Sequence, residues 1–102
     1  MHITFVKKVL LDGSSCAQCE AVFKQLVADG FSNKINHVVL ADARDNQSPG
    51  MVLALKHSVS KAPFFIIENR SNSSDQAIVS DQTIVTVLDR YADFKKFISK
   101  QN

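Results

Sequence analysis

This chain of 102 residues has no long apolar run, little excess of either charge and only two cysteines. The longest apolar runs, such as residues 64–67, fall far short of the roughly 18 residues of a membrane span, so we expect no membrane partner. Twelve basic and ten acidic residues leave a formal net charge of +2. This near balance lacks the strongly basic surface of a nucleic-acid-binding domain, so we expect no nucleic-acid partner either.

The two cysteines, Cys16 and Cys19, form one C-x-x-C motif. Two cysteines are too few for a disulfide scaffold, and a structural zinc site normally needs four ligands. The chain starts at Met1 without a basic region followed by an apolar segment, so we expect no secretory signal and a cytoplasmic location. In a cytoplasmic chain a lone C-x-x-C indicates a redox-active or metal-carrier site rather than a structural disulfide.

The length corresponds to one domain, residues 1–102, because domains commonly contain about 100 to 150 residues. A domain of this size buries about two-thirds of the surface of its unfolded chain, so its core suffices without disulfides or metals. Seven Phe and one Tyr follow the apolar pattern, which indicates a place in that core. We therefore expect a single monomeric domain with no resident metal or cofactor.

The apolar pattern predicts helices and strands in the order β-α-β-α-β-β-α. Strands are predicted where β-branched and aromatic residues cluster, and helices where apolar residues recur every three or four positions. Gly30 would end the first helix, while Ser48 and Pro49 would begin the second. The predicted strands cover residues 3–11, 35–41, 64–67 and 77–79, the predicted helices open at Cys16, Ser48 and Asp81, and residues 69–76 form a hairpin loop.

Two of the predicted helices depend on apolar residues at helical spacing, which would face the sheet. In the first helix these residues are Cys19, Val22, Phe23, Leu26 and Val27. In the last helix they are Ile84, Val87, Leu88, Tyr91, Phe94, Phe97 and Ile98, with Lys95, Lys96 and Lys100 near the negative end of the helix dipole.

The C-x-x-C motif opens a helix directly after a strand, and Ala62 and Pro63 later precede an apolar strand. With the closing hairpin and helix, this arrangement resembles the thioredoxin superfamily, and within it the small glutaredoxin-like proteins, over nearly the whole chain. The resemblance implies a thioredoxin fold, with a four-stranded mixed sheet and three flanking helices. It also implies that Pro63 is a cis-proline facing the cysteines and that the backbone of Ala62 pairs with an extended substrate.

A thiol at a helix N-terminus lies in the positive end of the helix dipole, which favours the thiolate. Cys16 is therefore the predicted nucleophile, which attacks a substrate disulfide to form a mixed disulfide. Cys19, one helical turn further on, is the predicted resolving residue. These roles describe a thiol–disulfide oxidoreductase whose substrate is a protein or small-molecule disulfide, and whose electron source is a reductase or glutathione.

Several residues near the motif depart from the family pattern. Leu10 stands where thioredoxins carry a buried Asp, so the usual proton acceptor for Cys19 is missing. Asp12 and Glu20 are candidate substitutes, although solvated or capping roles are the simpler interpretation. Lys7 and Lys8 are candidates to stabilise the Cys16 thiolate, although a strand lysine commonly extends to solvent.

Glutaredoxins bind glutathione at a Gly-Gly pair and an Asp at the start of the last helix. Here the corresponding residues are Ser80 and Asp81, which are therefore candidate substrate-binding residues beside Ala62 and Pro63. The simpler interpretation is that Ser80 and Asp81 cap the C-terminal helix.

A second resemblance leaves a different function open. Residues 13–19 are similar to the Gly-Met-Thr-Cys-x-x-Cys loop of heavy-metal-associated copper chaperones, and two thiolates suit Cu(I). Ser14 replaces the usual Met, however, and Ser48 with Pro49 begins a helix where the βαββαβ fold of those domains requires a strand. A partner-docking protein with idle cysteines is a further alternative.

Overall fold

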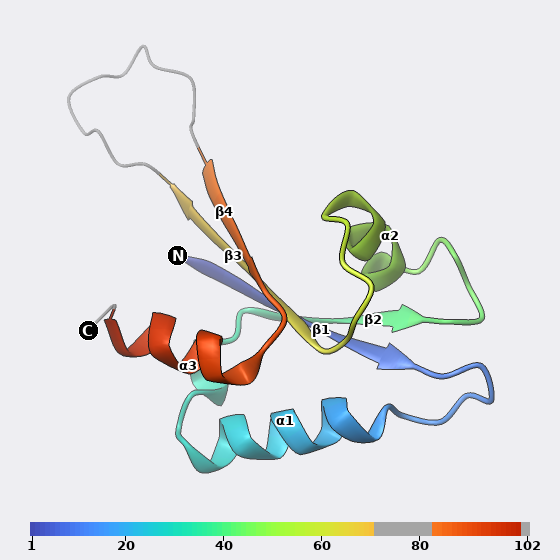
Figure 1. The fold of residues 1–102 in the computed structure, drawn as a ribbon, viewed down its shortest axis with the longest axis horizontal. Helices are drawn as coiled ribbons and strands as arrows, with labels where there is room; N and C mark the ends of the chain where they lie inside the picture. Colours follow the sequence, from blue (N-terminus) through green and yellow to red (C-terminus); the bar gives the residue numbers. More distant parts are fainter. Residues whose placement is uncertain (71–82, 101–102) are drawn as a thin grey trace.

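A computed structural model describes residues 1–70 and 83–100, which form an α/β structure with a four-stranded mixed sheet and three helices (Figure 1). Within these ranges, no helix is both long enough and apolar enough to cross a membrane. The elements are β1 (His2–Val9), α1 (Ala17–Ala28), a short 3-10 helix (Ser32–Lys34), β2 (His37–Asp42), α2 (Pro49–Lys56), β3 (Phe64–Arg70), β4 (Thr83–Leu88) and α3 (Tyr91–Lys100).

The sheet has the strand order β2-β1-β3-β4. β1 pairs parallel with β2 and antiparallel with β3, and β4 pairs antiparallel with β3. The β1–β3 ladder ends where Val6 lies opposite Phe64. β1 continues beyond this point to Val9, so its last residues have no β3 partner. This overhang of β1 positions the cysteines.

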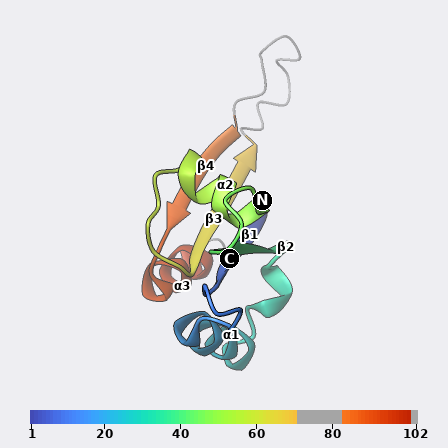
Figure 2. The same cartoon turned by 90° about the vertical axis from the view of Figure 1, so that its right-hand side faces the viewer.

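The helices cover the sheet unequally, with α1 and α3 on one face and α2 on the other (Figures 1 and 2). Successive residues of a strand point to opposite faces, so Phe5 packs under α1 and α3 while Val6 packs under α2. On the first face the rings of Phe65 and Phe94 stack with their centroids 4.0 Å apart. The predicted aromatic core is confirmed at these positions.

α1 begins and ends as its sequence predicts. Cys16 occupies the N-cap position with an extended backbone, and Gly30 follows the C-cap with a φ of +77°, a conformation that glycine adopts without strain. Cys19 and Leu26 are buried, whereas Phe23 and Val27 are 37% and 54% exposed. The apolar stripe that faces the core is therefore narrower than predicted.

α2 lies very close to β2. Ser48 is the N-cap and Pro49 the first helical residue, as predicted. The Ser48 hydroxyl makes no bond to the helix; it accepts from the Asp42 N–H at 2.9 Å and donates to the Asp45 carbonyl at 2.8 Å. A Cβ added to Gly50 would lie 2.4 Å from the Ala41 nitrogen, so only glycine fits at this helix–strand crossing.

The predicted C-terminal helix is confirmed over Tyr91–Lys100, but its predicted start at Asp81 is wrong. Residues Thr83–Leu88 form β4, with Leu88 opposite Phe65, and the helix begins only at Tyr91. Ile84, Val87 and Leu88 have helical spacing, but the segment is rich in β-branched residues, and the ladder with β3 satisfies its backbone.

The boundaries of other elements also differ from those predicted. β1 ends at Val9 rather than residue 11, because a tight turn follows it. Asn69 and Arg70 belong to β3 rather than to the hairpin loop. The predicted strand over residues 77–79 lies outside the described residues.

Candidate active site at the end of β1

A tight turn after β1 returns the chain to the strand. The N–H of Gly13 donates to the carbonyl of Leu10 at 2.9 Å, and the N–H of Leu10 donates to the carbonyl of Ser14 at 2.8 Å. Gly13 has a φ of +86°, which suits glycine at the third loop residue of such a turn. The turn brings Ser15 into a bridge with Val9, and Cys16 follows directly.

The backbone of Lys8 holds both cysteines. The Cys16 N–H donates to the Lys8 carbonyl at 3.2 Å, and the Lys8 N–H donates to Cys19 Sγ at 3.3 Å. These two Lys8 groups face the β3 side of β1, because the neighbouring Val9 carbonyl accepts from Ala43 on the β2 side. The cysteines therefore occupy the positions that a longer β3 would take.

Pro63 explains why β3 leaves this space. Continuing the β1–β3 register past Val6 and Phe64 would place Pro63 opposite Lys7 and Ala62 opposite Lys8. Proline has no N–H to donate to a ladder, so a strand commonly begins or ends beside it. The Ala62–Pro63 peptide bond is cis, as the resemblance implied. The site thus combines the start of α1 with the segment before β3.

The thiol of Cys16 is poised to ionise. Its partial burial raises its pKa, but the N–H groups of Cys19 and Gln18, the Cys19 thiol and the Lys8 ammonium all favour the thiolate. Together they lower the pKa of Cys16 below its ordinary 9.0. As the N-cap, Cys16 also lies at the positive end of the α1 dipole. Both cysteines are free thiols in this structure.

The thiol of Cys19 has the opposite character. It is 1% exposed, and burial raises its pKa to about 11, with the neighbouring Cys16 and Glu20 charges adding to the rise. The N–H of Lys8 opposes this effect only in part. Within one motif, therefore, the first thiol is accessible and acidic, whereas the second is buried and protonated.

The two adjacent lysines of β1 have different surroundings. Lys7 forms an ion pair with Glu20, with 3.7 Å between Nζ and Oε2. Lys8 lies on the opposite face, and its charge contributes to the lowered pKa of Cys16. The charge of Lys8 helps to lower the pKa of Cys16, and the charge of Glu20 helps to raise the pKa of Cys19. Asp12 instead accepts two hydrogen bonds from Ser14.

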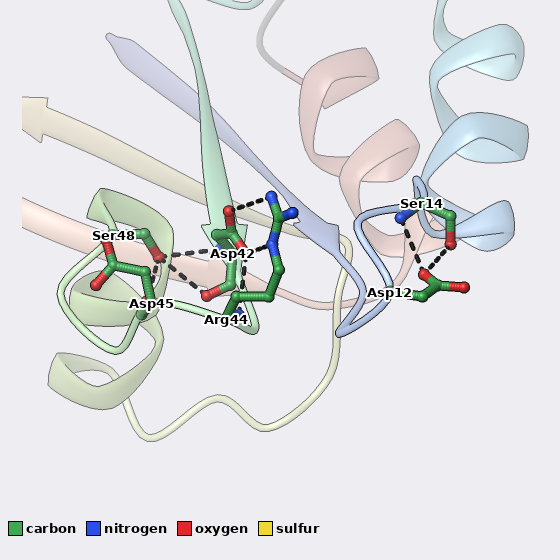
Figure 3. A network of polar contacts seen from close by, with 6 residues as sticks. All are labelled: Asp12, Ser14, Asp42, Arg44, Asp45 and Ser48. Carbon is green, nitrogen blue, oxygen red and sulfur yellow. Dashed lines mark hydrogen bonds and ion pairs between the residues drawn. The ribbon is translucent and has the colours of Figure 1, made fainter.

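A polar network braces the two loops beside the site (Figure 3). Arg44 donates two hydrogen bonds of 2.9 Å to the carboxylate of Asp42, which lower the pKa of that carboxyl to about 2. A Cβ added to Gly13 would lie 3.0 Å from Arg44 Nη1, so the guanidinium rests against the turn after β1. Arg44 therefore connects the loop after β2 with the turn that carries the cysteine motif.

A hollow of about 220 Å³ adjoins the site, and we call it the α2 hollow. Lys8 and Ala62 both line it, so it touches the strand that holds the cysteines and the segment before β3. Its described lining residues are Lys8, Ala41, Ala43, Met51, Ala54, Val59, Ser60, Lys61, Ala62 and Phe64. Nothing in the sequence pattern predicted this hollow, because its walls come from segments far apart in the chain.

The structure brings together most of the predicted site residues. Cys16 and Cys19 bond to the backbone of Lys8, and Ala62 lines the α2 hollow together with Lys8. Pro63 directly precedes Phe64, the β3 residue at the end of the β1–β3 ladder. Ser80 and Asp81 lie outside the described residues. α3 itself begins at Tyr91, after β4.

The described part of the chain contains no cluster of three or more His, Cys, Asp or Glu residues able to hold a metal ion. Comparison with protein-family models, with curated proteins and with solved structures finds no match to this chain.

Proposed function

We propose that this protein is a thiol–disulfide oxidoreductase of the thioredoxin fold, in which Cys16 attacks and Cys19 resolves. The observation that carries the proposal is the contrast between the two thiols. The pKa of Cys16 is lowered at the accessible start of α1, whereas that of buried Cys19 is raised to about 11. Disulfide exchange by two cysteines needs this division, because only the first thiol must be nucleophilic in the resting protein.

The first step is attack of the Cys16 thiolate on a substrate disulfide. A Cys16–substrate sulfur bond forms, the substrate S–S bond breaks, and the leaving thiolate takes a proton from water. The helix dipole and Lys8 favour the thiolate of Cys16, so the attacking group is ionised before the substrate arrives.

In the second step Cys19 loses its proton and attacks the Cys16 sulfur. The Cys16–Cys19 disulfide forms, and the second substrate thiol is released, so two electrons have passed from the cysteine pair to the substrate. A thiol reductant, either a reductase or glutathione, must return these electrons for another cycle. The sheet order β2-β1-β3-β4 and the place of Ala62 and Pro63 directly before β3 also agree with a thioredoxin fold.

The arrangement of the elements counts against the copper-carrier alternative. That fold requires a strand where this chain begins α2 at Pro49.

The test measures reduction of a disulfide by the wild-type protein and by Cys16→Ser and Cys19→Ser. Thioredoxin reductase with NADPH, or glutathione with its reductase, supplies the electrons in separate assays. We expect Cys16→Ser to lower the rate to background. We expect Cys19→Ser to retain the first step and to accumulate a mixed disulfide, which intact mass spectrometry detects.

Unchanged activity in Cys16→Ser would exclude the mechanism. Stoichiometric Cu(I) binding by the wild type, with no reduction of any disulfide in either assay, would replace the proposal with metal carriage. Ser15→Ala is the matched control, because it removes a neighbouring side chain and leaves both thiols in place.

A further inference from the structure

The α2 hollow has the size of a site for one small group. Its volume of about 220 Å³ is several times the roughly 30 Å³ that one water occupies, yet it lies below the roughly 300 Å³ at which pockets for whole drug-sized ligands begin. Ala41 and Phe64, both buried, belong to its lining, and Met51 and Ala54 line it from α2. A group of side-chain size with an apolar surface fits these dimensions.

The hollow exists because small residues meet there. Ala41, Ala43 and Ala54 leave space that larger side chains would fill, and Gly50 fixes α2 against the backbone of Ala41. Since α2 is held by this contact, it cannot simply settle into the space beside it. The volume is thus a fixed feature of the face that α2 covers.

The hollow also has a charge of one sign. Lys8 and Lys61 are the ionisable side chains among its described lining residues, which include no carboxylate. Asp12 and Asp89 line two adjoining hollows, which share lining residues with the α2 hollow. Asp12 is already bonded to both the N–H and the hydroxyl of Ser14. An apolar pocket with two lysines is complementary to an anion that has an apolar body.

The hollow is continuous with the site through Lys8 and Ala62. Lys8 holds both cysteines by its backbone, while its side chain lines the hollow. A ligand in the hollow would therefore contact the same residue whose backbone holds the cysteine pair. We propose that the α2 hollow binds a carboxylate next to a small apolar group, and that the disulfide substrate carries this pair of groups beside its reacting sulfur. The second half of this proposal rests on the proposed function, whereas the first half does not.

Binding alone is tested in Cys16→Ser/Cys19→Ser, which has no thiol chemistry. The probes are 3-phenylpropionate and its neutral amide, 3-phenylpropionamide, titrated into the 15N-labelled protein and followed by NMR. We expect the carboxylate to shift the amide signals of Lys8, Met51 and Lys61, and the amide probe to bind at least about threefold more weakly. Equal binding of the two probes, or shifts confined to other segments, would overturn the proposal.

Matched variants separate the two lysines of β1. Lys8→Met and Lys61→Met should each weaken binding of 3-phenylpropionate about three- to fivefold, which is the scale of a partly exposed ion pair. Lys7→Met is the control, because Lys7 faces the other side of the sheet and pairs with Glu20. An equal effect of Lys7→Met and Lys8→Met would show that only overall charge matters and would contradict the proposal.

Ala54→Leu fills the hollow and should abolish binding of 3-phenylpropionate, while the NMR spectrum remains that of a folded protein. Retained binding would contradict the proposal too.

Kinetics then test the substrate class in the protein with both cysteines. Two disulfide peptides are compared, one with an apolar residue and Glu beside the cysteine and one with Gln in place of Glu. Lys61→Met should raise KM for the Glu peptide about three- to fivefold more than for the Gln peptide, and kcat should change equally for both. Equal KM changes would overturn the substrate half. Probe binding without any disulfide reduction would instead refute the proposed function and leave the binding site standing.

Discussion

On the face under α1 and α3, large aromatic side chains close the core, whereas on the face under α2 small side chains leave a hollow. Phe5, Phe65 and Phe94 contact one another in a row on the first face. Ala41 and Gly50 bring backbone close to backbone on the second. The comparison indicates that the first face supplies most of the stability, while the second leaves room beside the cysteines.

The largest expected effect is on the closed face. Phe94→Ala removes a fully buried ring that stacks on Phe65 at 4.0 Å, so we expect it to lower the free energy of unfolding by about 3–5 kcal/mol. Met51→Ala, on the half-buried lining of the α2 hollow, should cost only about 1–2 kcal/mol. Urea denaturation measures both. Equal losses would mean that the two faces contribute alike and would break the comparison.

A smaller effect is expected where α2 meets β2. Gly50→Ala would gain about 1 kcal/mol of helix propensity, but its Cβ would lie 2.4 Å from the Ala41 nitrogen and would push α2 away. We expect a net loss of about 1–3 kcal/mol in the free energy of unfolding, again from urea denaturation.

Leu55→Ala on the same helix is the control, because this side chain is 84% exposed and its loss should stay within about 0.5 kcal/mol. A stabilising Gly50→Ala would show that α2 moves freely and would remove the reason for a fixed hollow.

The smallest expected effect is at the end of β1, where the two thiols differ in pKa. The pKa of Cys19 is raised to about 11 whereas that of Cys16 is lowered, so at pH 7 a far larger fraction of Cys16 is thiolate. The more basic thiolate is intrinsically more nucleophilic, which offsets about tenfold of this advantage. Iodoacetamide at pH 7 should therefore modify Cys16 at least about tenfold faster than Cys19.

Peptide mass spectrometry after partial modification measures this ratio. The rate at Cys16 should level off with rising pH at a lower pH than the rate at Cys19, because its thiolate forms first. Equal rates across the pH range would contradict the assigned division between the two thiols.

Features that depend on near neighbours in the chain were predictable. Cys16 begins α1, Gly30 ends it, and Pro49 opens α2, because caps and proline act within one helical turn. The segment Thr83–Leu88 was not predictable in this way, since its apolar spacing fits both a helix and a strand. Pairing with β3 decided in favour of the strand, and this pairing is not visible in the local sequence.

The role of Lys8 depended on tertiary structure in the same way. Two neighbouring lysines in one strand look equivalent in the sequence, yet Lys7 pairs with Glu20 while Lys8 holds both cysteines. The difference arises because β1 extends beyond β3, and because the backbone groups of Lys8 face the vacated side.

By itself, then, the sequence determined the position of a C-x-x-C motif at the start of a helix and the burial of core aromatic residues such as Phe5 and Phe94, because helix caps and hydrophobic periodicity are local or repeating signals. Only the tertiary structure decided which thiol is buried deeply enough to stay protonated, which lysine lies beside the pair, and that small residues of β2 and α2 leave a hollow there. Those outcomes depend on strand register and helix–sheet distance, which segments far apart in the chain set together.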